Sequence, residues 1–339
     1  MIERGIVAGE AGDEERLFEA SLRPRSLKDF TGQENLKENL SIAIEAARMR
    51  GEAMDHVLLH GPPGLGKTTL ATLIANELGT AFEQTSAPVL QKKLDLTGLL
   101  SSIRPKQVFF IDEIHRLAPD VEEMLYSALE DYRVDILVGT GPGARTHSLP
   151  VPKFTAVGAT TKLGSVSSPL RGRFGLVLRL DPYSNEDLAG IVSRSARILN
   201  FTLNDSIALS IAKRSRGTPR IANRLLRRVR DYSQVRANGE LTEEILGSAL
   251  VLLNVDPRGL DEVDYRLMKC LLTTYGGGPV GLNTWAIAAG EDANTLEEVY
   301  EPFLIQQNFI KRTSKGREAT VEAFDYFKVP LHRPQSVLF

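Results

Sequence analysis

Hydrophobic and polar positions follow two alternating periods in the first half of the chain. Short apolar runs of the kind found in buried strands are separated by segments in which apolar residues recur at helical spacing. The strand-like runs are "HVLLHG", "VFFIDE", "FTAVGATT" and "GLVLRL", and the helical segments include "KTTLATLIANELG" and "PDVEEMLYSALEDY". Gly79 is expected to end the first of these helices. The alternation predicts an α/β fold in which helices cover a parallel sheet.

The pattern changes farther along the chain. From about Ser184 it is helical, from "NEDLAGIVSRSARILN" to "TEEILGSALVLLN", and "VDPRGLD" is expected to be a linker. The last segment predicts helices followed by a two-stranded turn, "NFIKRTSKGREATVEAF". We therefore expect three domains, at residues 1–183, 184–254 and 255–339. A β-hairpin is expected at 133–154, where two strand-like runs flank a Gly/Pro-rich tip.

The composition narrows the class of protein without identifying it. With 42% apolar and 25% charged residues, the chain of 339 residues is typical of globular proteins. Its formal charge of −2 means that any nucleic-acid binding must come from local patches. The acidic opening segment and the lack of a long apolar run predict neither a signal peptide nor a membrane span. Cys270 is the only cysteine, which fits a reducing, cytoplasmic setting, and the histidines are not spaced like metal ligands.

The first candidate for chemistry is the stretch "GPPGLGKT", residues 61–68, which lies between a predicted strand and a predicted helix. Its glycines let backbone N–H groups turn inward around phosphate oxygens, and the following helix adds its positive N-terminal end. In this pattern Lys67 reaches the β- and γ-phosphates of a nucleotide, and the Thr68 hydroxyl holds Mg²⁺. The alternative, a chance glycine-rich turn, does not explain the strand and helix on either side.

Two further strand ends supply polar groups. In "VFFIDEIH", Asp112 is expected in the Mg²⁺ shell, and Glu113 is expected to orient and polarise the attacking water. "GATT" offers Thr160 or Thr161 as a hydroxyl near the γ-phosphate. Taken alone, the carboxylates would be solvated strand-end groups and the threonines would reflect β-propensity. Together with the glycine-rich loop they predict an ATP and Mg²⁺ site.

The turn "SSPLRGRFG" carries Arg171 and Arg173, each beside a glycine and without an acidic neighbour in the sequence. Phosphoryl transfer needs positive charge at the departing γ-phosphate, and arginine supplies it with a planar fork. An arginine at the edge of a protomer can reach into the site of the next subunit and so make hydrolysis depend on assembly. The alternative is a pair of solvated loop arginines.

The set of motifs resembles the AAA+ ATPases, and more closely the RuvB family of Holliday-junction branch-migration ATPases. The similar blocks include "DHVLLHGPPGLGKTTLA", "FIDEIHRL", "SPLRGRFG", "RSRGTPRIANRLLRRVRDY", "GGGPVGL" and "VYEPFLIQ", and they extend from about residue 22 to residue 320. The resemblance implies an AAA+ domain, a helical lid and a C-terminal winged helix. It also implies a homo-hexameric, ATP-driven motor on duplex DNA that acts with RuvA and, indirectly, with the RuvC resolvase.

The resemblance also assigns roles to single residues. It makes Arg173 the arginine that acts in a neighbouring subunit, with Arg171 as the second choice, and Arg220 an arginine that senses the γ-phosphate from the lid. It places further nucleotide contacts at Leu22, Arg23, Gly64, Thr69, Glu130, Asp131, Tyr132 and Tyr183.

The last segment is expected to be a winged helix with Trp285 in its core. Its candidate recognition helix, "TLEEVYEPFLIQQ", has three glutamates and no lysine or arginine, so it should not lie along phosphates. The following turn is basic, with Lys311, Arg312, Lys315 and Arg317, and predicts contact with phosphates without base reading. The resemblance singles out Arg312 and Arg317 as the DNA-contacting pair, although the family usually has proline and arginine where Ser314 and Lys315 stand here.

The hairpin and the rival functions complete the expectations. The hairpin carries apolar residues that either dock a partner, RuvA in the family, or pack on their own domain. These residues are Ile136, Leu137, Val138, Leu149 and Val151. One rival is a nucleotide-switched replication initiator, which the acidic recognition helix disfavours. A clamp loader or protein remodeller is disfavoured by the winged helix and by the absence of a zinc module or aromatic pore motif in the sequence.

Overall fold

The computed structural model describes residues 18–138 and 145–330, and these form two compact units. One unit comprises residues 22–183, and the other combines 184–330 with residues 18–21. The opening segment 1–17, on which the expectation about a signal peptide rests, lies outside the described residues, as does the hairpin tip 139–144. Among the residues that are described, no helix has the length and apolar character needed to cross a membrane.

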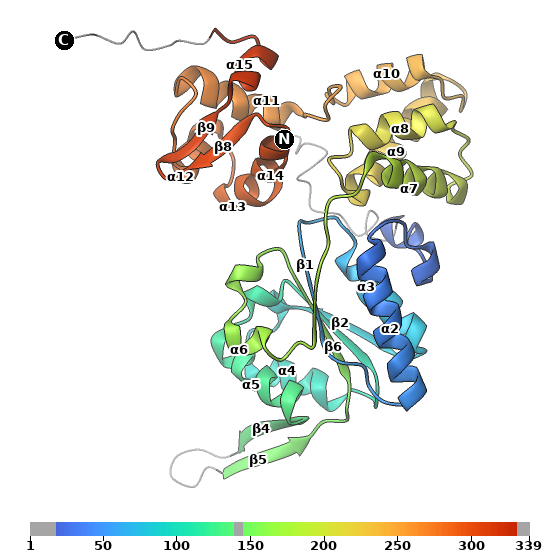
Figure 1. The fold of residues 1–339 in the computed structure, drawn as a ribbon, viewed down its shortest axis with the longest axis vertical. Helices are drawn as coiled ribbons and strands as arrows, with labels where there is room; N and C mark the ends of the chain where they lie inside the picture. Colours follow the sequence, from blue (N-terminus) through green and yellow to red (C-terminus); the bar gives the residue numbers. More distant parts are fainter. Residues whose placement is uncertain (1–17, 139–144, 331–339) are drawn as a thin grey trace, which may run out of the picture. The chain divides into compact units, whose positions relative to one another are not determined.

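A parallel sheet forms the centre of the first unit. Within the described part of residues 22–183 its strand order is β2-β3-β6-β1-β7, and all the pairings are parallel (Figure 1). The strands are β1 (Val57–His60), β2 (Phe82–Ser86), β3 (Val108–Asp112), β6 (Thr155–Thr160) and β7 (Leu176–Arg179). The central strands β1, β3 and β6 are almost entirely buried, which agrees with their continuous apolar sequences. The expected α/β architecture is confirmed.

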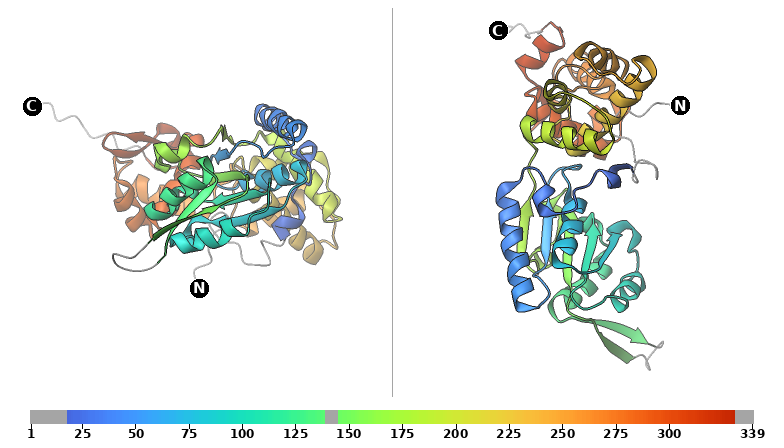
Figure 2. Two further views of the ribbon diagram at one scale, coloured as in Figure 1. Left: turned by 90° about the horizontal axis from the view of Figure 1, so that it is seen from below. Right: turned by 90° about the vertical axis from the view of Figure 1, so that its right-hand side faces the viewer.

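Helices cover both faces of this sheet. Figures 1 and 2 show α2 and α3 on one face and α4, α5 and α6 on the other. The helices are α2 (Glu34–Arg50), α3 (Lys67–Leu78), α4 (Lys93–Ser101), α5 (Pro119–Glu130) and α6 (Ser168–Arg171). Short 3-10 helices lie at Leu27–Asp29, Ala87–Val89, Ile114–Arg116 and Leu163–Ser165. Gly79 ends α3 in the left-handed conformation, as predicted.

The edge strand β2 was not predicted from the sequence. Its residues, "FEQTS", are mostly polar and only half-buried, so they lack both the apolar run of a central strand and a clear alternation. The strand forms because Phe82–Ser86 pairs with the buried strand β3 along its whole length. Pairing with a partner far along the chain therefore decides the structure here.

The predicted hairpin is present as β4 (Arg133–Val138) and β5 (Arg145–Pro150), which pair antiparallel. Val134 and Val151 at its base are buried in the hydrophobic core of the unit, and Ile136 packs against that core. Leu149 is exposed, and the side chains of Leu137 and Val138 lie outside the description. The base of the hairpin thus packs on its own domain, and of its five apolar residues named above only Leu149 is exposed within the described part.

The second unit begins with a group of helices and continues into a winged-helix arrangement. The first group is α7 (Asn185–Ile198), α8 (Asp205–Lys213), α9 (Pro219–Arg236) and α10 (Glu243–Leu252). The second comprises α11 (Glu262–Lys269), a π-helix (Cys270–Thr274), α12 (Leu282–Ala289), α13 (Ala293–Thr295), a second π-helix (Leu296–Tyr300), α14 (Glu301–Gln306), β8 (Ile310–Thr313), β9 (Gly316–Ala319) and α15 (Val321–Tyr326). Trp285 is fully buried in the core of this second group, as predicted.

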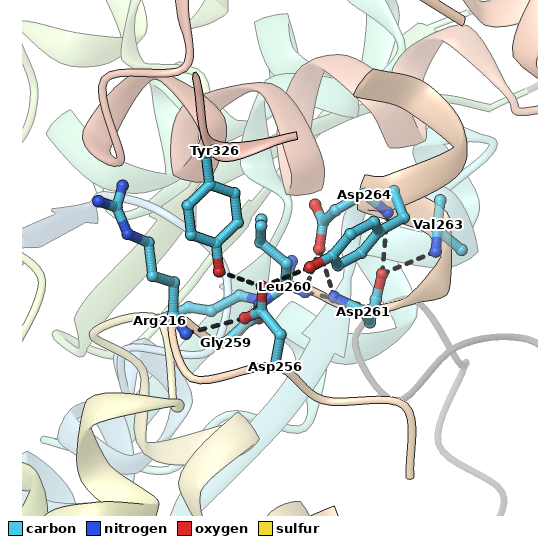
Figure 3. Close-up of polar contacts among 10 residues, drawn as sticks. Arg216, Asp256, Gly259, Leu260, Asp261, Val263, Asp264 and Tyr326 are labelled. Carbon is cyan, nitrogen blue, oxygen red and sulfur yellow. Dashed lines mark hydrogen bonds and ion pairs between the residues drawn. The ribbon is translucent and has the colours of Figure 1, made fainter. Parts of the chain in front are cut away.

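The segment that was expected to be a linker is held by a dense set of hydrogen bonds (Figure 3). Asp256 Oδ1 accepts from the backbone N–H groups of Arg258 and Leu260, at 2.8 Å each. Its Oδ2 accepts from the hydroxyls of Tyr265 (3.0 Å) and Tyr326 (2.6 Å). The segment expected to be a linker does connect α10 to α11, and these hydrogen bonds make it a folded junction.

Candidate functional site

The glycine-rich loop between β1 and α3 has the backbone that phosphate binding requires. Gly61, Gly64 and Gly66 have φ angles of 146°, 82° and 102°, a region that favours glycine. A Cβ on Gly61 would lie 2.4 Å from the carbonyl oxygen of Leu180, so no larger residue fits there. Lys67 is 7% exposed, and its ammonium donates to the carbonyls of Gly61 (2.8 Å) and Pro62 (2.9 Å). The cation thus lies within the curve of the loop.

Helix α3 begins at Lys67 without a side-chain cap. Its N-cap is Gly66, which has no side chain to satisfy the first N–H groups of the helix. Thr68 and Thr69 lie in this first turn. Helix α3 is twelve residues long and follows the glycine loop directly. Because its first turn has no side-chain cap, the N–H groups there can donate to phosphate oxygens. The loop and the helix therefore fit the phosphates of a nucleotide.

The carboxylates predicted at the end of β3 occupy different local structures. Asp112 is the last residue of the strand, and its Oδ1 accepts from the backbone N–H of Glu113 at 3.0 Å. Glu113 has a φ of 51°, which turns the chain sharply after the strand. Its Oε2 lies 3.5 Å from Nε2 of His115. The two acidic side chains therefore follow one another at a sharp bend.

The two threonines at the end of β6 differ in their hydrogen bonding. The Thr160 hydroxyl lies 2.9 Å from Nδ1 of His115 and accepts from the backbone N–H of Lys162 at 3.0 Å. Within the described residues, Thr161 Oγ1 is buried and has no hydrogen-bond partner. A buried hydroxyl without a partner is rare in folded proteins, and an oxygen of a ligand or of water would satisfy it. Of the two candidates, Thr161 therefore suits the γ-phosphate better.

Strand order brings these groups to one edge of the sheet. The neighbours β3, β6 and β1 end at Asp112, at Thr160 and at His60 just before the glycine loop. In the register, His60 lies beside Thr160. The carboxyl ends of adjacent parallel strands are the usual place for ligands in α/β proteins.

Arg173 has a close environment that the sequence did not reveal. Its Nη2 lies 2.8 Å from Oε2 of Glu130 at the end of α5, and its Nη1 donates to the carbonyl of Pro169 at 2.7 Å. The guanidinium lies 4.5 Å from the centre of the Tyr126 ring. The sequence places no acidic residue close to Arg173 in the chain. In the fold, however, Glu130 from a distant part of the sequence lies beside it. Both side chains retain solvent access, at 26% for Arg173 and 64% for Glu130.

The surroundings of Arg173 lie at the opposite edge of the sheet from the phosphate loop. Gly175 packs against Asp55, and the N–H of Leu176 donates to the carbonyl of His56, just before β1 begins. The phosphate loop starts where β1 ends. One chain therefore places its arginine turn and its phosphate loop at opposite ends of β1, roughly 10 Å apart along the strand.

The segment Glu130, Asp131 and Tyr132 lies beside the arginine turn. A hollow of about 440 Å³ is lined by Leu129, Glu130, Ser168, Pro169, Gly172 and Arg173. Asp131 pairs with Arg133 at 3.2 Å, and the Tyr132 ring packs edge-on against Phe154. Of these three predicted contact residues, Glu130 meets Arg173 directly, and Asp131 and Tyr132 follow it in the chain with partners of their own.

The remaining predicted nucleotide contacts divide between the two units. The Tyr183 hydroxyl donates to the carbonyl of Leu65 in the glycine loop at 3.2 Å, so Tyr183 touches the predicted site. Leu22 is buried and Arg23 is half-buried in the same unit. Arg220 belongs to the other unit, at the start of α9, where its Nε lies 3.7 Å from Oε1 of Glu19.

The basic turn of the winged-helix segment is organised by one buried carboxylate. Glu301 is fully buried, and each of its oxygens accepts from both Arg312 and Arg317, at 2.7–3.0 Å. Although burial opposes it, hydrogen bonds from Arg317 and Arg312 hold the pKa of Glu301 below its ordinary value. The side chain of Arg312 is 53% exposed and that of Arg317 is 16% exposed. Lys311 and Lys315 point to solvent beside them.

This contact corrects the picture of an acidic recognition helix. The expected single helix is divided into α13, the π-helix and α14, with Pro302 near the last junction. Glu301 does not add to the exposed charge of this helix, because it faces the protein interior. Glu297 and Glu298 remain as the partly exposed carboxylates.

Comparison with known proteins follows the same division of the chain. Residues 22–180 match a family model described as "Holliday junction DNA helicase RuvB P-loop domain". Residues 183–256 match the RuvB AAA lid domain, and 257–328 match the RuvB C-terminal winged helix domain. The chain belongs to the RuvB family.

Relatives in this family are similar over nearly the whole length. A protein from Solibacter usitatus named "Holliday junction branch migration complex subunit RuvB" is 68% identical over 97% of this chain and 96% of its own. A protein of the same name from Koribacter versatilis is 58% identical over 96% of this chain and 91% of its own length. The solved RuvB motor of Thermotoga maritima is 49% identical, with a TM-score of 0.84 over 91% of this chain and all of that one. The AAA+ fold with lid and winged helix is thereby confirmed, and so is nucleotide binding as the property of its P-loop domain.

Sequence reasoning missed side chains that support the RuvB-family site residues. Glu301 was taken for a surface charge, because its neighbour Tyr300 and the next turn give no sign of a buried acid. Tyr126, beneath the Arg173 guanidinium, donates its hydroxyl to Glu122, which also accepts from Ser167. The helical spacing of Glu122 and Tyr126 was the one available signal for this cluster.

Proposed function

We propose that this chain is the motor subunit of a branch-migration complex, hydrolysing ATP and moving duplex DNA at Holliday junctions together with RuvA. The relatives' names support the complex and the junction as its substrate. The observation that carries the mechanism is the separation of the arginine turn from the phosphate loop across the sheet. An intact pocket then requires a neighbouring copy, as in a closed ring, for which we propose six subunits.

Within one pocket, the described residues divide the work. Lys67 and the loop N–H groups bind the β- and γ-phosphates, and Glu113 orients the attacking water. Thr68 and Asp112 would hold Mg²⁺, which uses few protein ligands and fills its shell with phosphate and water oxygens. Bound Mg²⁺ neutralises the charge that develops on the phosphates.

The remaining assignments complete the proposal. Thr161 contacts the γ-phosphate, and Arg173 of the next subunit stabilises the departing charge. Arg220 reports the γ-phosphate to the lid, and Arg312 and Arg317 contact DNA. Further nucleotide contacts are assigned to Leu22, Arg23, Gly64, Thr69, Glu130, Asp131, Tyr132 and Tyr183. The division of the chain near residues 183 and 254, docking of RuvA on the hairpin and indirect action with RuvC belong to the same proposal.

ATP turnover on random-sequence duplex tests this function. We expect steady hydrolysis that duplex DNA stimulates irrespective of sequence, and strand exchange at a four-way junction when RuvA is added. A replication initiator would bind ATP without repeated turnover and would prefer one sequence. Turnover that does not respond to DNA, or a single round of hydrolysis, would contradict the motor proposal.

Salt dependence tests the wing. Arg312→Ala should weaken binding equally for unrelated duplexes and flatten the slope of log K against log[salt] by about 0.9 for one lost phosphate contact. Arg317→Ala should act in the same direction. Arg266→Ala is the matched control, because Arg266 is an arginine of α11 in the same winged-helix segment and pairs with Glu291 at 3.2 Å. Equal slopes for Arg312→Ala and the parent protein would remove the wing from the DNA interface.

A further inference from the structure

One arginine joins the lid helices to the winged-helix segment. Arg216 lies between α8 and α9, four residues before Arg220, and its side chain is only 3% exposed. Its φ of 54° is in the left-handed region, which is uncommon for a residue with a side chain. This backbone conformation directs a charged side chain out of the lid and into the adjoining segment. Such strain persists only where surrounding contacts enforce it.

The polar partners of Arg216 among the described residues lie in the junction and at the start of α11 (Figure 3). Its Nη2 donates to Oδ2 of Asp264 at 2.5 Å and lies 3.4 Å from Oδ2 of Asp261. Its Nε donates to the carbonyl of Gly259 at 2.9 Å. Asp261 and Asp264 are 2% and 0% exposed, so the contact is almost completely removed from water.

The two carboxylates are held in fixed positions by the helix that they begin. Asp261 is the N-cap of α11 and accepts from the N–H groups of Val263 and Asp264. Asp264 in turn accepts from the N–H of Asp261 at 2.8 Å. Burial raises the pKa of Asp264 from its ordinary 3.8 to about 8, although Arg216 acts against this rise. Among the described contacts, the guanidinium of Arg216 is the only cation that meets Asp261 and Asp264.

Close backbone contact reinforces the same junction. Gly259 has a φ of 84°, and a Cβ there would lie 2.8 Å from the carbonyl oxygen of Arg214. The lid loop and the junction thus meet backbone to backbone, with no room for a side chain. The polar contacts of Arg216 lie directly beside this approach.

The guanidinium also packs on the helix that organises the basic turn. Its centre lies 4.5 Å from the Phe303 ring and 6.0 Å from the Tyr300 ring. Between these two aromatics in sequence is Glu301, the buried carboxylate that holds both Arg312 and Arg317. A chain of direct contacts therefore extends from the loop before α9 to the two arginines of the wing.

From these contacts we infer that Arg216 is a positioning residue that makes the lid and the winged-helix segment move as one body. A displacement of the start of α9, where Arg220 lies, is thereby passed to Arg312 and Arg317 on the wing. The inference rests on the proposed function for its consequence, the coupling of hydrolysis to DNA movement. The rigidity of the junction does not depend on the proposed function, and it can be measured without ATP turnover.

Distance measurements on the full chain test the rigidity. Spin labels on cysteines replacing Val235 in α9 and Ile287 in α12, which are 79% and 81% exposed, report the lid and the winged-helix segment, with Cys270 changed to serine. We expect one narrow distance distribution, unchanged by a non-hydrolysable ATP analogue. A broad distribution in this otherwise unaltered protein, or one that shifts with the analogue, would overturn the inference.

The variant that isolates the ionic contact is Arg216→Met with Asp264→Asn. Arg216→Met alone would leave two buried carboxylates without a cation and could prevent folding. The double change removes one charge from each side and keeps an oxygen for the N–H of Asp261, while Asp261 still accepts from the N–H groups of Val263 and Asp264. We expect the distance distribution to broaden in this variant and to stay narrow in Arg214→Met. Arg214 is a matched control, because it donates to Ser210 within the lid. Equal distributions in the double variant and the parent would contradict the role of Arg216.

Coupling is the second readout. The double variant should retain duplex affinity and basal ATP turnover but lose about tenfold in strand exchange per ATP hydrolysed. Strand exchange per ATP at the parent level would overturn the transmission step. If the parent itself showed no DNA-stimulated turnover, the proposed function would fail, while the distance measurement would still decide the rigidity of the junction.

Discussion

Replacing Arg173 by alanine should leave ATP binding intact and slow hydrolysis by roughly a thousandfold or more. The guanidinium supplies positive charge where the γ-phosphate departs, and its planar fork can donate to two phosphate oxygens at once. Loss of the half-exposed pair with Glu130 should change stability little, because solvent-exposed ion pairs contribute little. Steady-state turnover and equilibrium binding of a fluorescent ATP analogue together separate the two effects.

Arg171→Ala is the matched control for this experiment. Arg171 lies two residues earlier, at the end of α6, and its side chain is exposed. We expect it to change turnover much less than Arg173→Ala. A larger loss in Arg171→Ala would exchange the roles of the two arginines, and normal turnover in both variants would remove the arginine turn from the catalytic site.

Glu113→Gln should abolish most hydrolysis while ATP remains bound, with a loss of roughly a hundred- to ten-thousandfold. The substitution keeps the shape of the side chain but removes the carboxylate that orients and polarises water. Phosphate release in a single turnover measures the chemical step directly, and ATP affinity is measured in parallel. Asp112 and the phosphate loop are unaltered, so binding should not weaken.

The control for Glu113→Gln is Glu123→Gln on α5. Glu123 is exposed, and its carboxylate lies 4.0 Å from the ammonium of Lys93. It should hydrolyse ATP at the parental rate. If Glu113→Gln also retained that rate, Glu113 would not be the residue that activates water.

The central sheet of the first unit could be predicted because its strands are short, apolar and bounded by recognisable chemistry. The glycine loop sets the end of β1, the acidic pair sets the end of β3, and the threonines set the end of β6. In parallel sheets these ends lie at the same edge, so the sequence alone was enough to expect the phosphate loop, Asp112 and the two threonines there. The sequence could not decide between Thr160 and Thr161. Their hydroxyls differ only in the folded structure, where that of Thr160 contacts His115 and that of Thr161 does not.

Interactions between distant segments account for what could not be predicted. The polar strand β2 depends on pairing with β3, and Arg173 meets Glu130 only after the chain has folded. The same holds for the buried acid Glu301 and for the junction around Asp256, whose side chain accepts four hydrogen bonds. Local patterns give the charge of such residues but not their partners.

Mixing two inactive variants tests most directly whether the catalytic site is shared between subunits. Arg173→Ala keeps an intact pocket, and Glu113→Gln keeps an intact arginine turn. We predict that each alone is inactive and that the mixture recovers ATP turnover, because some pockets of the first are then completed by the arginine of the second. A mixture that remains as inactive as its components, under conditions where mixed rings are shown to form, would contradict a site built by two protomers.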